Sequence, residues 1–133
     1  MAAEKTNIEI ISKHWGFEKI IYNQQYCGKL LYIIKGKQTS LHYHNSKDET
    51  FYIAKGRVLV YHSSELAKIK EMINADRSEE VFDYLSKITL APGDSLHMPP
   101  KTVHQIVGLE DTELFEFSTR HLDSDSYRLI KGD

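Results

Sequence analysis

Short apolar runs alternate with polar breaks rich in Gly, Pro, Asn and Asp along most of the chain. The runs are rich in β-branched and aromatic residues, a composition that favours strands. The predicted strands are residues 8–12, 17–23, 29–34, 39–43, 50–54, 57–62, 88–90, 95–98, 103–108 and 113–118. Lys35-Gly36 and Lys55-Gly56 separate neighbouring runs and indicate tight hairpin turns, because glycine adopts a positive φ without steric cost. Many short strands without strand–helix alternation predict an antiparallel sandwich or barrel.

One segment, residues 63–87, has a helical rather than a strand pattern. Leu66, Ile69 and Ile73 recur at helical spacing, and Ser64 is placed to cap the first turn. A second short helical piece is expected to begin at Ser78. We therefore predict a helical insertion around residues 64–86. We expect it to pack on the exterior of the barrel or against a second subunit, rather than to act as a substrate lid.

Composition limits the classes of function. The chain has 133 residues, so we expect a single domain over residues 1–133. The net charge of −2 and the scattered Lys and Arg residues give no basis for binding nucleic acid or an anionic membrane. Cys27 is the only cysteine, and the N-terminal residues lack the apolar core of a signal peptide. These features predict a soluble cytoplasmic protein without nucleic-acid or membrane partners.

Two separate stretches carry residues that commonly bind metals. His42 and His44 are two residues apart, so on a strand both side chains project from one face, about 7 Å apart at their Cα atoms. A polar turn follows, and a hairpin there would direct Glu49 back towards both imidazoles. The second stretch, from Gly93, ends in His104. Neutral imidazoles and a carboxylate are ligands for first-row divalent metals, so this set is a candidate metal site.

Together, the two stretches resemble the two motifs of the cupin superfamily. Gly36, His42, His44, Glu49 and Gly56 match the first motif at every spacing, and Gly93, Pro99 and His104 match the second. Lys101 replaces a common turn glycine, and Gly108 stands where an asparagine often follows. The resemblance covers about residues 36–108. It implies an all-β fold, a double-stranded β-helix or jelly-roll barrel, with His42, His44, Glu49 and His104 as metal ligands.

Such a ligand set suits one divalent transition metal: Mn, Fe, Zn, Ni or Co. Three imidazoles and one carboxylate leave two positions on an octahedral metal for water, a chelating substrate or dioxygen. In the cupin family, the position of His97 often faces the barrel interior near the metal. His97 is therefore a candidate for orienting a ligand or for proton transfer. The alternative is a histidine hydrogen-bonded within the barrel wall.

A looser resemblance connects the chain to the cupin domain of bacterial type II phosphomannose isomerases. It rests on Trp15-Gly16-Phe17-Glu18, on the strand from Gly28 to Gly36 and on the tail Asp125-Ser126-Tyr127-Arg128. It implies metal-dependent isomerase or epimerase chemistry on a small polar metabolite, a sugar or sugar phosphate. Lys47 and Arg128 would then hold a phosphate or hydroxyl-rich substrate. A solvated surface charge is the alternative for both residues.

Two other functions fit the same ligand set: a non-haem metal dioxygenase and a sugar- or metabolite-binding barrel without turnover. His14, His62 and His121 have no ligand spacing and are interpreted as structural or exposed. Small cupins often form dimers, and pairing would cover unpaired strand edges. We therefore expect a homodimer that binds a small molecule, possibly a carbohydrate.

Overall fold

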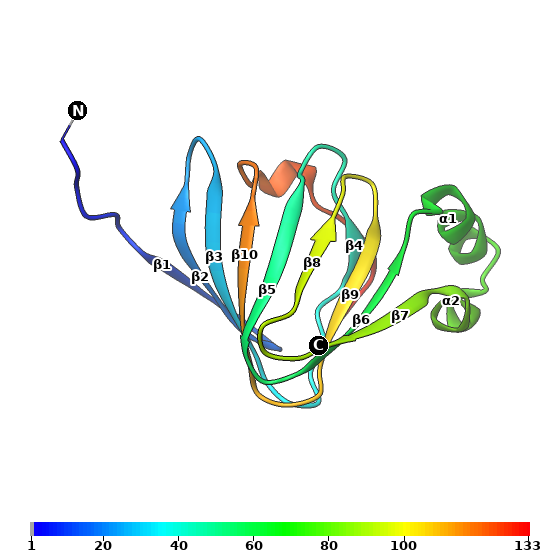
Figure 1. Cartoon of the computed structure of the whole chain (residues 1–133). Helices are drawn as coiled ribbons and strands as arrows, with labels where there is room; N and C mark the ends of the chain where they lie inside the picture. Colours follow the sequence, from blue (N-terminus) through cyan, green and yellow to red (C-terminus); the bar gives the residue numbers. More distant parts are fainter. Residues whose placement is uncertain (1) are drawn as a thin grey trace.

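All ten apolar runs form strands, and the C-terminal tail adds a strand that was not predicted. The structure is a computed structural model and describes residues 2–133 (Figure 1). Its strands are β1 (Glu9–Lys13), β2 (Gly16–Asn23), β3 (Cys27–Ile33), β4 (Leu41–Tyr43), β5 (Glu49–Lys55), β6 (Val58–Ser63), β7 (Ser86–Leu90), β8 (Ser95–Met98), β9 (Val103–Gly108), β10 (Thr112–Ser118) and β11 (Tyr127–Ile130). Its helices are α1 (Leu66–Asn74), α2 (Ser78–Tyr84) and a short 3-10 helix, η1 (Asp123–Asp125).

The strands form two antiparallel sheets. One has six strands in the order β1-β2-β3-β10-β5-β8, and the other has five in the order β11-β4-β9-β6-β7. Strands that follow each other in sequence often lie in opposite sheets, so the chain repeatedly crosses between the two layers (Figure 1). This is the predicted all-β jelly-roll barrel.

Alternation along each strand divides the interior into an apolar part and a polar part, because successive side chains point to opposite faces. One apolar cluster fills the space between the two sheets, with Ile33, Ile53 and Leu114 fully buried. A second cluster, which includes Leu41 and Ile69, lies between the five-stranded sheet and the helices. Polar and charged residues take inward positions in the rest of the barrel, where they form the cavity described below.

Gly36 and Gly56 have the predicted positive φ, at +83° and +88°. The prediction that they form hairpin turns is wrong, because β3 and β4 lie in different sheets, as do β5 and β6. Both turns instead carry the chain from one sheet to the other. At Gly56 an added Cβ would lie 2.4 Å from the Asp111 carbonyl oxygen, so this crossing needs glycine.

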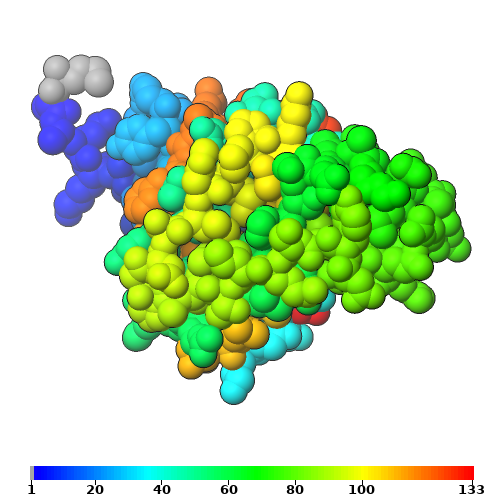
Figure 2. Space-filling view, turned by 45° about the vertical axis from the view of Figure 1, so that its right-hand side comes forward, coloured from blue at the N-terminus to red at the C-terminus, as the bar shows by residue number. Residues whose placement is uncertain are grey.

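The helical insertion is confirmed as α1 and α2, packed on the exterior of the five-stranded sheet (Figure 2). The cap predicted at Ser64 is wrong. Helix α1 begins after Glu65, without a side-chain cap, and the Ser63 hydroxyl accepts a hydrogen bond from the Glu65 N–H at 3.0 Å. Across residues 2–133, no helix has the length and apolar character needed to cross a membrane.

Candidate metal centre and active-site cavity

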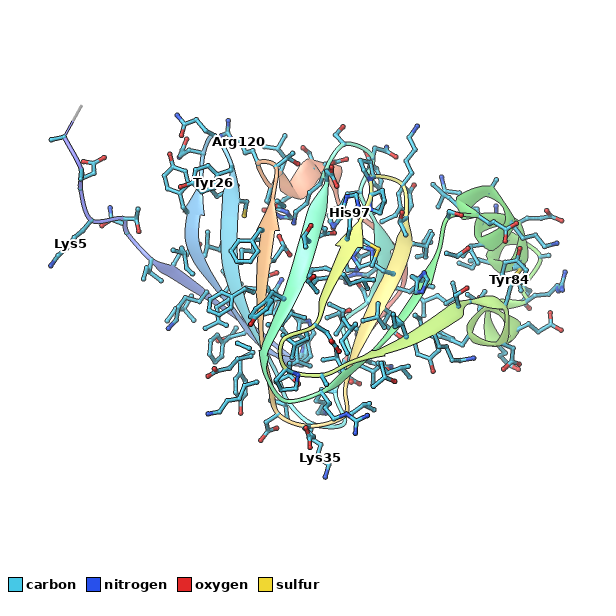
Figure 3. All side chains as sticks on the ribbon, in the orientation of Figure 1. Lys5, Tyr26, Lys35, Tyr84, His97 and Arg120 are labelled. Atoms are coloured by element: carbon cyan, nitrogen blue, oxygen red, sulfur yellow. The ribbon has the colours of Figure 1, made fainter. Side chains whose placement is uncertain are left out.

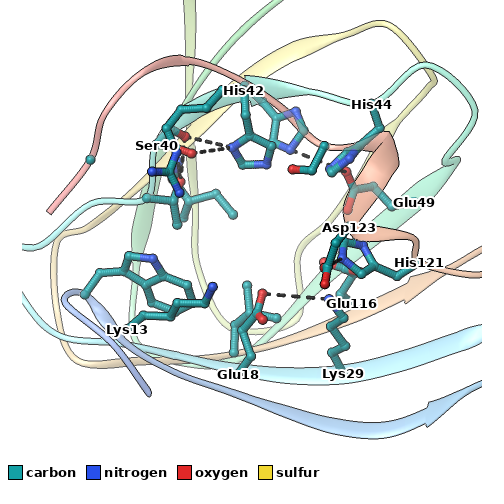
Figure 4. Close-up of a pocket in the computed structure, with 18 of the residues that line it drawn as sticks. Lys13, Glu18, Lys29, Ser40, His42, His44, Glu49, Glu116, His121 and Asp123 are labelled. Carbon is teal, nitrogen blue, oxygen red and sulfur yellow. Dashed lines mark hydrogen bonds and ion pairs between the residues drawn. The ribbon is translucent and has the colours of Figure 1, made fainter. Parts of the chain in front are cut away.

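A cavity of about 490 Å³ lies between the two sheets (Figure 4). Its size is within the range of about 300–1,000 Å³ that is usual for small-molecule sites. The side chains that line it and are used below are Lys13, Trp15, Glu18, Lys29, Ser40, His42, His44, Lys47, Glu49, His104, Glu116, His121, Asp123 and Arg128. Most of them are polar or charged, which is unusual for the inside of a small barrel and indicates a functional site.

The three predicted histidine ligands meet on one wall of this cavity. His42 lies on β4 and is the register partner of His104 on β9, while His44 directly follows β4. One ring nitrogen from each of the three histidines lies within 4.8 Å of the other two. Figure 4 shows His42 and His44 side by side, facing the open space. The i, i+2 spacing on a strand therefore produces the convergence that the sequence predicted.

Backbone carbonyls fix the orientation of all three rings. The Nδ1 atoms of His42, His44 and His104 lie 2.9 Å, 2.9 Å and 3.0 Å from the carbonyl oxygens of Ser40, Asp125 and Thr102. A carbonyl can only accept a hydrogen bond, so each Nδ1 carries the proton and donates it. Each Nε2 is then left with a free lone pair, which is the arrangement that a metal-binding histidine needs.

Glu49 supplies the carboxylate. Its Oε2 atom lies 3.5 Å from His44 Nε2 and 3.4 Å from His104 Nε2, and the residue is only 3% exposed. The predicted route to this position is wrong, since β4 and β5 do not pair. Glu49 starts β5 in the six-stranded sheet and reaches the histidines across the barrel. The three histidines form a group that could hold a metal ion, and the Glu49 carboxylate lies beside two of them.

The pKa values of the histidines agree with this role. Burial is the main cause that lowers the pKa of His44 and of His104 to about 4. Burial, followed by the neighbouring His104 and His44, also lowers the pKa of His42 well below its usual value. All three imidazoles are thus neutral near pH 7 and do not need to lose a proton before they bind a metal.

Lys47 lies inside the cavity, so the alternative of a solvated surface charge is wrong. The residue is 4% exposed, and its Nζ atom lies 2.6 Å from Glu116 Oε2, 3.6 Å from Glu49 Oε1 and 3.0 Å from His121 Nδ1. Burial alone would lower the pKa of Lys47, but the Glu116 and Glu49 carboxylates outweigh burial and raise it. Lys47 is therefore a buried ammonium beside the histidine cluster.

The two carboxylates beside Lys47 differ in their protonation. Burial, then the negative charge of Glu116, raises the pKa of Glu49. Burial would also raise the pKa of Glu116, but Lys47, and Lys29 after it, outweigh burial and lower it. Glu116 is thus the carboxylate that stays charged in the metal-free protein, and a metal at the histidines would favour the charged form of Glu49 as well.

The 3-10 helix η1 holds the loop that carries these groups. The Asp125 carboxylate accepts hydrogen bonds from the backbone N–H groups of Asn45, Ser46 and Lys47 at 2.9 Å, 3.1 Å and 3.0 Å. The Asp125 backbone carbonyl accepts the hydrogen bond from His44 Nδ1 at 2.9 Å. One residue near the C-terminus therefore orients a predicted metal ligand and the start of the loop that leads to Glu49.

Glu116 was not among the predicted site residues, and His121 was predicted to be structural or exposed. His121 in fact lines the cavity and contacts Lys47. Glu116 could have been found from strand alternation, because it lies two residues after the fully buried Leu114 on β10. A charged residue at an inward position of a strand indicates a polar site. His121 follows the last residue of β10 in an irregular segment and had no such signal.

Arg128 and His97 have different positions. Arg128 on β11 is the register partner of His42 and lines the cavity, but the residue is exposed, so its role in substrate binding stays a prediction. The side chain of His97 on β8 is 59% exposed, and its Nε2 lies 2.6 Å from Asp48 Oδ1 on the outside of the barrel (Figure 3). The expectation that His97 faces the interior is wrong, because the next residue, Met98, takes the inward position.

A jelly-roll barrel with three histidines and a glutamate on its inner wall is a cupin, and solved structures agree with this class. KdgF from Halomonas sp. has a TM-score of 0.65 and 18% sequence identity, over 90% of this chain and 92% of that one. Oxalate decarboxylase from Bacillus subtilis has a TM-score of 0.72 and 14% identity, over 92% of this chain and 30% of that one. At these identities, the likeness concerns the fold alone.

The family model of D-lyxose isomerase matches residues 12–126, so the chain belongs to this family. It is 28% identical over 138 residues to a D-lyxose/D-mannose isomerase of Thermosediminibacter oceani, which covers 92% of this chain and 76% of the relative. It is 27% identical over 135 residues to a D-lyxose ketol-isomerase of a Thermofilum species, which covers 90% of this chain and 75% of the relative. The prediction of a cupin with metal-dependent, sugar-isomerase-like function is confirmed.

Proposed function

We propose that this protein interconverts an aldose and its ketose, with D-lyxose and D-mannose as the first substrates to test. The observation that carries the proposal is the buried Lys47–Glu116 pair, with its 2.6 Å contact, placed beside three neutral histidines in one cavity. An isomerase needs a group that moves a proton between neighbouring carbons and groups that stabilise charge on their oxygens. The cavity holds both, and the names of the two relatives support this choice of substrates.

His42, His44, Glu49 and His104 would hold one divalent metal, and Mn, Fe, Zn, Ni and Co all suit these ligands. When bound, the metal supplies Lewis-acid polarisation of the sugar carbonyl and the adjacent hydroxyl. The backbone carbonyls that bind the three Nδ1 atoms keep the imidazoles aligned for this task.

The remaining groups of the cavity would perform the proton transfer. In the forward direction, Glu116 takes the proton from C2 of the open-chain aldose and returns it to C1, while the proton of the C2 hydroxyl passes to the oxygen on C1. Lys47 stabilises the negative charge that develops on the sugar oxygens during this transfer. As Lys47 turns towards these oxygens, its contact with Glu116 weakens and Glu116 becomes a stronger base. Arg128, which lines the same cavity, is proposed to bind a substrate hydroxyl.

Turnover of D-lyxose and D-mannose under anaerobic conditions tests the function. We expect the protein loaded with Mn²⁺ to form the corresponding ketoses, and EDTA to abolish the reaction. In D₂O, the residual aldose or the product should gain deuterium, detected by NMR, whenever the abstracted proton exchanges with solvent. A metal-loaded protein that forms no ketose from either sugar would contradict the proposal, and a requirement for dioxygen would favour the oxygenase alternative.

We also propose a homodimer that forms through the outer face of the six-stranded sheet. Ile10, Lys19, Leu30, Phe115 and Tyr52 form one register row across five strands, and all but Lys19 are apolar or aromatic. Phe117 is 55% and Ile10 is 60% exposed on this face. The outer face of the other sheet is covered by α1 and α2, whereas no element within residues 2–133 covers this one (Figure 1). Exposed apolar faces of this kind mark interaction sites.

A second copy fits this face better than a charged partner. The row includes a single cation, Lys19, and the neighbouring row pairs the carboxylate of Glu113 with the cation of Lys55, so the face carries charges of both signs. Five strands about 4.8 Å apart, each about 20 Å long, give a flat area of roughly 400 Å² before side-chain relief is counted. That is a substantial part of the roughly 800 Å² per partner that stable interfaces bury.

Phe117→Lys should convert the dimer to a monomer. Each dimer would lose two buried phenylalanine side chains, each worth roughly 1.5–3 kcal/mol, so the dimer Kd should rise by at least about 100-fold. Sedimentation equilibrium measures the change. Leu109→Lys, at a residue that is 38% exposed in the turn between β9 and β10, is the matched control and should leave the dimer intact. A monomeric unmodified protein would contradict the proposed interface.

A cytoplasmic location remains a proposal. Cys27 is a free thiol with 1% exposure, and burial is the main cause that raises its pKa. A free cysteine fits a reducing compartment, where disulfides do not persist. Its burial also protects the thiol from oxidation.

A further inference from the structure

The cavity has a second pair of charged groups on the wall opposite the histidines. Glu18 on β2 and Lys29 on β3 lie across the open space from His42 and His44 (Figure 4). Strand register explains why both face inward: Glu18 is the partner of the buried Leu31 on β3. Lys29 is the partner of Glu116 on β10, so this pair directly adjoins the group proposed to move the proton.

The Glu18–Lys29 pair is incomplete. Lys29 is 2% exposed, and the only carboxylate oxygen within 4.0 Å of its Nζ atom in residues 2–133 is Glu18 Oε1, at 3.8 Å. This distance is too long for a hydrogen bond. By contrast, Lys47 contacts Glu116 at 2.6 Å. Lys29 lines the cavity, so its ammonium can donate to an oxygen of a bound ligand there.

The donors and acceptors of this pair match neighbouring hydroxyl groups. Lys29 offers only donors, and the Glu18 carboxylate offers only acceptors. A hydroxyl both donates and accepts, so two neighbouring hydroxyls of one sugar can satisfy both side chains. A terminal phosphate is disfavoured here, because the carboxylates of Glu18 and Asp123 both line this part of the cavity. Trp15, 7% exposed, lines the cavity as well and offers an apolar surface to the C–H groups of a sugar.

The Glu18–Lys29 pair also borders a second space. A second space of about 320 Å³ begins beside Glu18 and Lys29 and continues between the β1–β2 hairpin and Leu122. Both spaces are lined by Glu18, Lys29, His121 and Asp123, so the pair lies where the two adjoin. This position fits a role in binding hydroxyls that a five-carbon and a six-carbon sugar have in common.

We propose that Glu18 and Lys29 form the subsite for the distal hydroxyls of an open-chain, unphosphorylated sugar whose carbonyl end lies at the histidines. This inference rests on the proposed isomerase function. It assigns binding, and not proton transfer, to the two residues. The subsite gives a role to a charged pair that faces the cavity from the wall opposite the histidines.

Steady-state kinetics of Glu18→Gln test the subsite. Loss of a hydrogen bond to a charged group should raise KM for D-lyxose and for D-mannose by about 10-fold or more. The kcat should stay within about 3-fold, because binding is lost equally in the ground state and the transition state. Lys29→Met should raise KM by a similar factor, and only its KM is compared, because loss of Lys29 also raises the pKa of Glu116. Glu110→Gln and Lys37→Met, at exposed positions outside the cavity, are the matched controls and should leave KM unchanged.

Metal content and Tm identify a variant that has failed to fold, and Lys29→Gln replaces Lys29→Met in that case. A purely structural role for the pair would lower Tm without changing KM in the folded protein. If the unmodified protein turns over both sugars while Glu18→Gln and Lys29→Met keep its KM, the subsite is wrong and the isomerase function stands.

Calorimetric titration with D-mannitol, which has no carbonyl to isomerise, separates the subsite from the reaction. The unmodified protein should bind D-mannitol, and Glu18→Gln should bind it at least about 10-fold more weakly. This pattern in a protein without turnover would support the subsite and contradict the isomerase function. A lower KM for D-mannose 6-phosphate than for D-mannose would contradict the proposal that the bound sugar is unphosphorylated.

Discussion

His44→Ala is expected to remove most of the bound metal and, with it, the isomerase activity. The unmodified protein should contain about one transition metal per chain, because its cavity has four protein ligands of the type that such metals prefer. His44 Nε2 faces the Glu49 carboxylate at 3.5 Å, and its Nδ1 is already committed to the Asp125 carbonyl. Since loss of an outer-shell partner alone costs about 10–100-fold in metal affinity, loss of a ligand should cost more than about 100-fold.

Elemental analysis of the purified protein measures this change, and ketose formation follows it. His97→Gln is the matched control, because this exposed histidine pairs with Asp48 on the outer surface and lies outside the cavity. We expect its metal content and activity to equal those of the unmodified protein. Full metal content in His44→Ala would show that the ligand assignment is wrong.

Glu116→Gln is expected to reduce kcat by about 10²–10⁴-fold while the metal stays bound, because it removes the group proposed to carry the proton. The amide keeps the shape of the side chain but cannot accept the C2 proton. Lys47→Met should also reduce kcat, by removing the ammonium that stabilises charge on the sugar oxygens. Because the two side chains act together, the double variant should lose little more activity than the more impaired single variant.

Deuterium incorporation from D₂O distinguishes a proton-transfer role from a structural one. With metal retained, Glu116→Gln should bind D-lyxose and fail to exchange its C2 proton. Each single variant leaves one buried charge without its partner, at a cost of about 3–5 kcal/mol, so Tm should fall in both. The double variant should recover part of that loss. If a stable Glu116→Gln protein exchanges the C2 proton at the normal rate, a group other than Glu116 carries this proton.

The convergence of His42 and His44 could be predicted because it depends on local geometry. His42 and His44 converge through strand alternation alone, and the glycines at positions 36 and 56 mark where the chain leaves one sheet for the other. The hairpin prediction failed because the pairing of the strands on either side of each turn is not a local property. Predicting it requires knowing that consecutive strands join different sheets, and short-range sequence patterns do not show this.

The charged groups of the cavity were harder to predict, because they come from strands far apart in sequence. Lys29 and Glu116 face each other across β3 and β10, and both read as ordinary surface residues in isolation. Only the buried neighbours at i±2, Leu31 and Leu114, indicate that they point inward. The same test would have placed His97 outside, since the adjacent Met98 is a core residue.

The hydrogen bonds between Asp125 and the loop that begins at Asn45 affect the order in which the protein folds and binds a metal. Asp125 fixes the His44 ring and binds three successive amide groups, so the loop cannot adopt its final shape without it. A ribosome must therefore translate the message past Asp125 before the nascent barrel can bind a metal. Metal uptake would then follow the synthesis of this residue, and proteins shortened before it should emerge as empty barrels.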